Sequence, residues 1–145
     1  MEQSLVKQIK EGLSLEELDP KSYSPLGLAY IGDSIYEIVI RTMVISEGNM
    51  SVNKYHQKSS SMVKASAQVE VFKKIEHLLT EEEMAAYKRG RNAKSGSMAK
   101  HASMMDYRKA TGVEALMGYL YLKGQMERII ELIRIGLNVG EKNES

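Results

Sequence analysis

A single carboxylate interrupts the most apolar helical stretch of this chain. Asp33 lies within residues 28–36, whose sequence LAYIGDSIY is otherwise almost free of charge. The apolar side chains do not keep to one stripe, since Leu28 and Ile35 share one side of the helix while Tyr36 shares the face of Asp33. A helix that is apolar nearly all round is expected to be buried, and a buried carboxylate is costly unless it is paired, hydrogen-bonded or bound to a metal. We therefore expect the fold to need the charge of Asp33.

Length and composition favour one domain without covalent cross-links. The chain has 145 residues and a mass of 16.3 kDa, which is enough for a real hydrophobic core. It contains no cysteine, and this excludes disulfides, cysteine-based zinc sites and cysteine nucleophiles. The first residues lack the pattern of a signal peptide, and charged residues divide the longest apolar stretch before it reaches the length of a membrane span. These features predict a cytoplasmic protein with no membrane partner.

Apolar periodicity and capping signals predict an all-α chain. Ser24 followed by Pro25 is a typical helix start, and Thr80 with Glu83 forms a capping box that begins another helix. Apolar residues at steps of three and four predict one long amphipathic helix from 51 to 79. Gly124 fits a helix C-terminus. The predicted helices cover residues 2–12, 25–46, 51–79, 80 to about 87, about 106–122 and 125–138.

Positive charge gathers between residues 88 and 109, although the net charge of the chain is only +1. The segment 88–97 has two glycines and little apolar content, which predicts a mobile basic loop. Its basic and amide side chains suit phosphate and sugar contacts, while the lack of aromatic residues disfavours base stacking. Backbone recognition of double-stranded RNA is favoured over an ordinary solvated surface segment. The candidate RNA-binding residues are Lys88, Arg89, Arg91, Asn92, Lys94, Lys100, Arg108 and Lys109.

A second carboxylate, Glu114, also lies in a mostly apolar helix. A glycine and an alanine accompany each acid: Gly32 near Asp33, Gly118 near Glu114, and one alanine beside each. Glycine inside a helix usually has a packing reason, so the two helices are able to cross closely and bring the acids into one pocket. Clustered carboxylates favour a hard ion such as Mg²⁺, and a metal-bound water is a ready nucleophile against a phosphodiester.

Structural interpretations of these acids stay open at this point. A single helical acid more often belongs to an ion pair, and Arg41 and Arg128 are the candidate partners. Glu37 lies one turn after Asp33 and is either a third ligand or, as we favour, the partner of Arg41. Because two such acids lie beside small residues, a metal site and a structural ion pair are equally favoured.

Two motifs carry a resemblance to a known family. Residues 30–34 (YIGDS) resemble the FLGDS signature of ribonuclease III domains, and residues 113–118 (VEALMG), followed by Tyr121 and Leu122, resemble their second acidic motif. With RGRNAK at 89–94 the chain resembles the compact bacterial form, the Mini-ribonuclease III family. The resemblance covers about residues 20–138 and implies that residues 1–145 form a single, dimeric ribonuclease III-like helical domain. It also implies that Asp33 and Glu114 are catalytic residues and ligands of Mg²⁺.

The function implied by this resemblance is a Mg²⁺-dependent endoribonuclease that acts on double-stranded RNA as a homodimer. The resemblance further implies maturation of the ends of the large-subunit (23S) ribosomal RNA precursor, with ribosomal protein L3 as a stimulating partner. Ala29 and Thr111 stand where full-length members of the family carry a glutamate and an aspartate, so one tightly held Mg²⁺ is favoured over two. The alternatives are a non-catalytic helical RNA-binding module, such as a ribosome-assembly factor, and a helical dimerisation scaffold.

Overall fold

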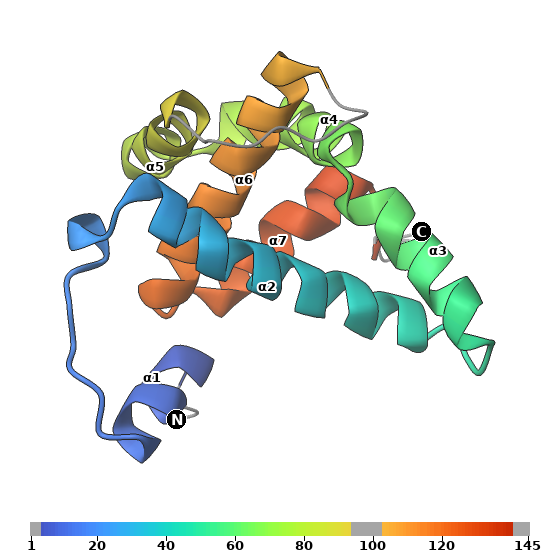
Figure 1. Ribbon diagram of the computed structural model, residues 1–145, viewed down its shortest axis with the longest axis horizontal. Coiled ribbons are helices and arrows are strands. Elements are labelled where there is room, and N and C mark those ends of the chain that lie inside the picture. The colour runs from blue at the N-terminus through green and yellow to red at the C-terminus, as the bar shows by residue number, and fades with distance from the viewer. Residues whose placement is uncertain (1–3, 94–102, 141–145) are drawn as a thin grey trace, which may run out of the picture.

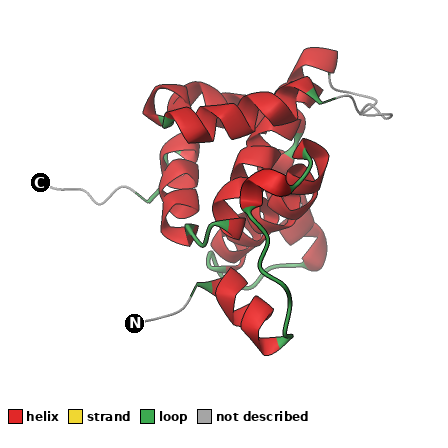
Figure 2. Cartoon of the chain, turned by 90° about the vertical axis from the view of Figure 1, so that its left-hand side faces the viewer, coloured by secondary structure: helices red, strands yellow, loops and turns green. Residues whose placement is uncertain are grey.

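The computed structural model describes residues 4–93 and 103–140, and these residues form helices and connecting turns without any β-strand (Figure 2). The all-α class predicted from the sequence is therefore confirmed. None of the helices in these two ranges is long and apolar enough to cross a membrane. In chain order the elements are α1 (Leu5–Gly12), η1 (Pro20–Ser22), α2 (Pro25–Ile45), α3 (Val52–Val63), α4 (Ala65–Ile75), η2 (Glu76–Leu78), α5 (Glu81–Asn92), α6 (Met104–Leu122) and α7 (Met126–Leu137).

The capping signals in the sequence mark real helix ends. The Ser24 hydroxyl accepts a hydrogen bond from the Gly27 N–H at 3.0 Å, at the start of α2. Thr80 and Glu83 exchange both bonds of a capping box at the start of α5. Gly124 follows α6 with a φ of +76°, a conformation that glycine adopts without strain. These three predictions are confirmed. Each of them depends only on residues close together in the sequence.

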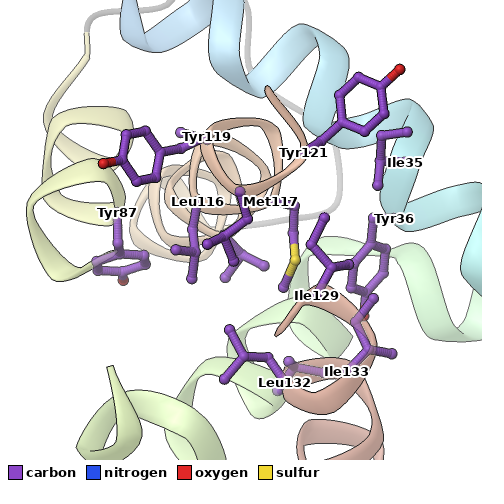
Figure 3. Packing of buried hydrophobic residues seen from close by; sticks show 14 of the residues in the cluster. Ile35, Tyr36, Tyr87, Leu116, Met117, Tyr119, Tyr121, Ile129, Leu132 and Ile133 are labelled. Atoms are coloured by element: carbon purple, nitrogen blue, oxygen red, sulfur yellow. The ribbon is translucent and has the colours of Figure 1, made fainter. Parts of the chain in front are cut away.

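Helix α6 lies at the centre of the fold. In Figure 1 α2 crosses it on one side, with α4, α5 and α7 packed around it. Its residues Leu116, Met117 and Leu120 are completely enclosed. Figure 3 shows Leu116 and Met117 among side chains from the surrounding helices, including Tyr87 of α5 and Ile129 of α7. A helix that is apolar on all sides reaches low free energy only in such a central position.

The prediction of one long helix over residues 51–79 is wrong, because the helix is interrupted at Lys64. This residue has φ −63° and ψ +158°, an extended conformation that ends α3 and begins α4 in a new direction. No proline or glycine marks the break. Two long side chains supply donors to the freed carbonyl groups of α3: the Tyr36 hydroxyl bonds to Met62 at 3.3 Å, and the Gln68 amide bonds to Val63 at 2.8 Å.

The predicted basic loop is helical over its first part. Helix α5 continues to Asn92, so Lys88, Arg89 and Arg91 are helical residues. Gly90 is not a loop residue but a packing residue, since a Cβ there would lie 2.5 Å from the Cβ of Ala115 in α6. Residues 94–102, with the candidates Lys94 and Lys100, lie outside the described residues.

Helix α2 is buried on one side only, and this corrects the expectation that Asp33 is enclosed. Asp33 is exposed in the single chain. Next to it, Tyr30 is 80% exposed, and Leu26, Ile38 and Ile45 are exposed as well. The apolar character of α2 on this side therefore does not serve the core of its own chain.

Candidate active site

The two acids meet because α2 and α6 cross with their backbones in contact. A Cβ added to Gly32 would lie 1.7 Å from the carbonyl oxygen of Glu114, and one added to Gly118 would lie 1.9 Å from the carbonyl oxygen of Leu28. Only glycine permits so close an approach of two helices. The crossing inferred from the small residues is therefore confirmed for both glycines. The alanine in the second motif, Ala115, packs instead toward Gly90 of α5.

This crossing places the Asp33 and Glu114 carboxyl groups within hydrogen-bonding reach of each other. Asp33 reaches the site from the exposed side of α2, while Glu114 is half-buried in the wall made by α6. Burial, the charge of Asp33 and the hydrogen bond to it raise the pKa of Glu114 to about 8. The neighbouring Tyr36 is also affected, since burial and the charge of Glu114 raise the pKa of its hydroxyl to about 12. Without a cation, Glu114 therefore keeps its proton up to about pH 8.

The chemistry of this donor set fits a hard divalent ion. Two close carboxylates, one of them exposed, suit Mg²⁺, which takes one or two protein carboxylates and keeps several waters. Within residues 4–93 and 103–140, no group of three or more His, Cys, Asp or Glu side chains gathers to hold a metal. Ala29 is buried and has no polar side chain. The Thr111 hydroxyl donates a hydrogen bond to the Tyr107 carbonyl at 3.0 Å.

The arginines considered as partners of the two acids are engaged with other acids. Arg41 lies 3.4 Å from Glu37 on the same face of α2, so the favoured pairing of these two residues is confirmed. Arg128 of α7 makes a two-pronged bond to the buried Glu83, with both N···O distances at 2.8 Å. The ion-pair explanation of Asp33 and Glu114 therefore loses both of its candidates.

The candidate RNA-binding residues that the structure describes lie on two packed helices, α5 and α6. Lys88 and Arg108 are exposed, and Lys109 is partly exposed. The Arg89 guanidinium donates to the carbonyl of Tyr23 at 3.0 Å, which ties α5 to the start of α2.

Arg91 and Asn92 lie together at the C-terminal end of α5. The Arg91 guanidinium is 5.8 Å from the centre of the Tyr87 ring, and its Nε donates to the Asn92 side chain at 3.2 Å. The structure thus gives Arg91 an orientation along α5, whereas Lys88 and Arg108 project into solvent.

One polar residue at the site was not anticipated from the sequence. Gln68 of α4 is 3% exposed and its amide faces the carboxyl group of Glu114. It reaches this position because of the break at Lys64, which turns α4 toward α6. The sequence carries no signal for that break, so Gln68 looked like one more residue of a long helix.

Comparisons with known proteins agree with the class that this fold and site define, a helical nuclease domain with a divalent-metal site. The sequence profile of the Ribonuclease III domain matches residues 26–125, which span both crossing helices. The chain belongs to the ribonuclease III family, whose members are metal-dependent endoribonucleases that act on double-stranded RNA.

The curated relatives carry a more particular name, Mini-ribonuclease 3. That of Clostridium tetani is 47% identical over 91% of this chain and 88% of its own length. That of Enterococcus faecalis is 48% identical over 87% of this chain and 98% of its own length. The crystal structure of a Fusobacterium nucleatum protein is also similar, with a TM-score of 0.75 and 32% identity over 83% of this chain and 96% of that one.

Proposed function

We propose that this protein is a Mg²⁺-dependent endoribonuclease that hydrolyses phosphodiester bonds in double-stranded RNA, with Asp33 and Glu114 as metal ligands and catalytic residues. The observation that carries the proposal is the meeting of the two carboxyl groups at the crossing of α2 and α6. The family motifs at both positions support it. We place the whole activity in one ribonuclease III-like domain, residues 1–145, with its core at about 20–138.

Each acid contributes differently to binding the ion. Asp33 is exposed and presents its carboxylate to solvent and substrate. Glu114 is half-buried and has a raised pKa, so it must release its proton before it binds a cation. The bound ion supplies Lewis-acid stabilisation of the phosphodiester and a water of lowered pKa. The close backbone contact at Gly32 fixes both ligands on rigid helices, so little reorganisation is needed when the ion binds.

The basic side chains of α5 and α6 are proposed to grip the RNA duplex. Lys88 and Arg108 are exposed on these two helices, and both helices pack near the α2–α6 crossing. Contacts to phosphates position a duplex without reading its sequence. The full proposed set also includes Arg89, Arg91, Asn92, Lys94, Lys100 and Lys109.

A homodimer accounts for the exposed apolar side of α2. Tyr30 is 80% exposed, Ile45 61% and Ile38 52%, all on the helix that carries Asp33. Several large apolar side chains exposed on one helix are typical of an interface. A second copy packed on α2 would cover it and would bring the two Asp33 sites onto one assembly, as cutting both strands of a duplex requires.

The natural substrate that we propose is the precursor of large-subunit (23S) ribosomal RNA in the cytoplasm, with ribosomal protein L3 as a stimulating partner. The similarity to proteins named Mini-ribonuclease 3 supports this proposal. Cleavage of a precursor transcript with and without ribosomal protein L3 tests it. Correctly placed ends that form faster with ribosomal protein L3 are expected.

One assay tests the activity itself. The protein is incubated with long double-stranded RNA at matched concentrations of Mg²⁺ or EDTA, alongside Asp33→Asn, Glu114→Gln and the control Glu37→Gln. We expect cutting only with Mg²⁺, loss of cutting by at least ~100-fold in the two site variants, and retained duplex binding in both. Glu37→Gln keeps most of the activity because Glu37 pairs with Arg41.

Two results of this assay would favour the alternatives. A shift of duplex RNA in a gel without cutting at any Mg²⁺ concentration indicates a non-catalytic RNA-binding module. Neither cutting nor binding indicates a dimerisation scaffold.

A further inference from the structure

Gln68 occupies an unusual position for a polar side chain. It lies in the first turn of α4, directly after the break at Lys64, and is 3% exposed. Its Nε2 donates to the carbonyl oxygen of Val63 at 2.8 Å, at the end of α3. This bond assigns the nitrogen of the amide to the side of Val63, since the amide oxygen would repel the Val63 carbonyl.

The same amide also reaches the site. It interacts with the carboxyl group of Glu114 and favours its charged form. Its bond to Val63 uses one N–H, so the second N–H is available to Glu114. Of the two acids, Glu114 is the one held in a largely apolar wall, and an amide donor favours its negative form.

The other end of the amide has no partner. Gln68 Oε1 is buried and makes no hydrogen bond. Leaving a buried acceptor unpaired costs free energy, and most buried polar groups in proteins avoid it. Methionine has a similar length and would fill this space without that cost. The amide therefore serves the Val63 carbonyl while its own oxygen stays unpaired, and its second N–H is free for a further role.

We propose that Gln68 is a positioning residue for Glu114: the Val63 carbonyl anchors its amide, and the amide holds the Glu114 carboxylate toward Asp33 for a divalent ion. This rests on the proposed function, in which Glu114 is a metal ligand. Second-shell donors of this kind orient ligands, and their loss typically weakens metal affinity about 10–100-fold.

A purely structural role for Gln68 makes a different prediction. In that case the amide only caps the freed end of α3, as Tyr36 does through its bond to Met62 at 3.3 Å. Tyr36→Phe removes this neighbouring cap and leaves every amide donor in place. It is therefore a matched control for damage to the α3–α4 junction.

The test compares Gln68→Met, Gln68→Leu, Tyr36→Phe and Glu114→Gln with the wild-type full-length protein. Calorimetric titration with Mg²⁺, and with Mn²⁺ as a second probe, measures ion affinity without RNA, while thermal unfolding in EDTA measures stability. We expect Gln68→Met to bind either ion about tenfold more weakly. Its Tm should fall as that of Tyr36→Phe does, because each variant removes one donor from the end of α3. Gln68→Leu repeats the test if the methionine variant fails to fold. Tyr36→Phe is expected to lower Tm and keep the wild-type affinity.

The outcomes separate this inference from the function on which it rests. Wild-type ion affinity in Glu114→Gln would remove the proposed metal site itself. Loss of binding in Glu114→Gln together with wild-type affinity in Gln68→Met overturns only the role of Gln68. Equal weakening in Gln68→Met and Tyr36→Phe assigns the effect to the helix junction, and this also overturns the proposal.

Discussion

The backbone of Gly32 lies directly against that of Glu114, so closely that a Cβ at position 32 would stand 1.7 Å from the Glu114 carbonyl oxygen. The residue next to Gly32 is Asp33, the other acid of the site. The contact that joins α2 to α6 is therefore the same contact that sets the spacing of the two carboxyl groups. One contact thus determines both how the two helices pack and how far apart the two carboxyl groups lie.

Gly32→Ala is expected to lower the free energy of unfolding by at least ~3 kcal/mol, because the added methyl group meets backbone atoms that cannot turn away. Urea unfolding measures this change. Gly12→Ala is the control, since a Cβ there has nothing within 4 Å and alanine in a helix gains up to ~1 kcal/mol. Similar stability of the two variants would contradict the close crossing.

The ion-free protein should lose stability through Glu114 as the pH rises. Burial and the charge of Asp33 raise the pKa of Glu114 from 4.5 to about 8, so the folded state keeps a proton that the unfolded chain releases. Between these values the folded state binds more protons, and the contribution to the free energy of unfolding falls with rising pH. It is fully present below about pH 4.5 and is lost as the pH passes about 8.

Glu114→Gln removes this titration. In EDTA, its stability relative to the wild type should therefore increase by more than ~1 kcal/mol between about pH 5 and pH 8, since one pKa unit corresponds to ~1.4 kcal/mol. Urea unfolding across this range gives the difference, which cancels the titration of other acids. Saturating Mg²⁺ should reverse the trend in the wild type alone. A flat difference in EDTA would show that Glu114 is ionised in the folded protein.

Glu83→Ala should destabilise the fold by ~3–5 kcal/mol without changing ion affinity. It leaves Arg128 facing a buried position with no carboxylate and removes the capping box of α5. Chemical denaturation and Mg²⁺ titration measure the two effects. Glu81→Ala, on the same first turn but exposed, should change stability by less than ~1 kcal/mol.

Lys88→Gln and Arg108→Gln should each weaken duplex binding and reduce the slope of log affinity against log salt by about 1. Both side chains are exposed, and neither is a proposed metal ligand. Fluorescence anisotropy with labelled double-stranded RNA in EDTA measures affinity over a range of salt concentrations. Lys74→Gln on α4, also exposed, is expected to change neither quantity. If the control and the two variants behave alike, α5 and α6 do not form the RNA-binding surface.

Ile38→Glu should convert a dimer into a monomer, because it places a charge in the middle of the exposed apolar side of α2. Sedimentation velocity at several protein concentrations measures the change. Leu13→Glu, at the exposed end of α1, serves as the control and should leave the assembly unchanged. A wild type that sediments as a monomer at all concentrations would contradict the proposed dimer.

Features that depend on neighbouring residues could be predicted from the sequence. The caps at Ser24 and Thr80 follow from side chains three residues from the groups that they bond. The helix crossing followed from glycine, because Gly32 and Gly118 are costly inside helices unless something approaches them closely. The pairing of the two acids then followed from their place beside these glycines.

Features that depend on distant contacts could not be predicted. The break at Lys64 has no local cause, since its freed carbonyl groups are served by Tyr36 from α2 and by Gln68 from beyond the break. Apolar periodicity continued through it and indicated one helix. Gly90 looked like a loop residue because only the three-dimensional fold shows Ala115 packed against it.

The exposure of Asp33 also lay beyond sequence reasoning. An apolar surface on all sides of a helix predicts that each side is covered, but not whether by the same chain or by another. The sequence pattern of α2 predicts burial but does not distinguish burial within one chain from burial between two. The structure shows that only one side is covered by its own chain.

The glycine contact between α2 and α6 has a consequence for how this nuclease opens and evolves. Many enzymes carry their reactive groups on loops that unfold locally at small cost, but the two acids proposed here as metal ligands lie on the two helices that anchor the core. Backbone amides around Asp33 and Glu114 should exchange with deuterium only when the whole molecule unfolds. Mutation therefore has little freedom to retune the site without loss of the fold, and new substrate preferences must arise in the helices and segments around it.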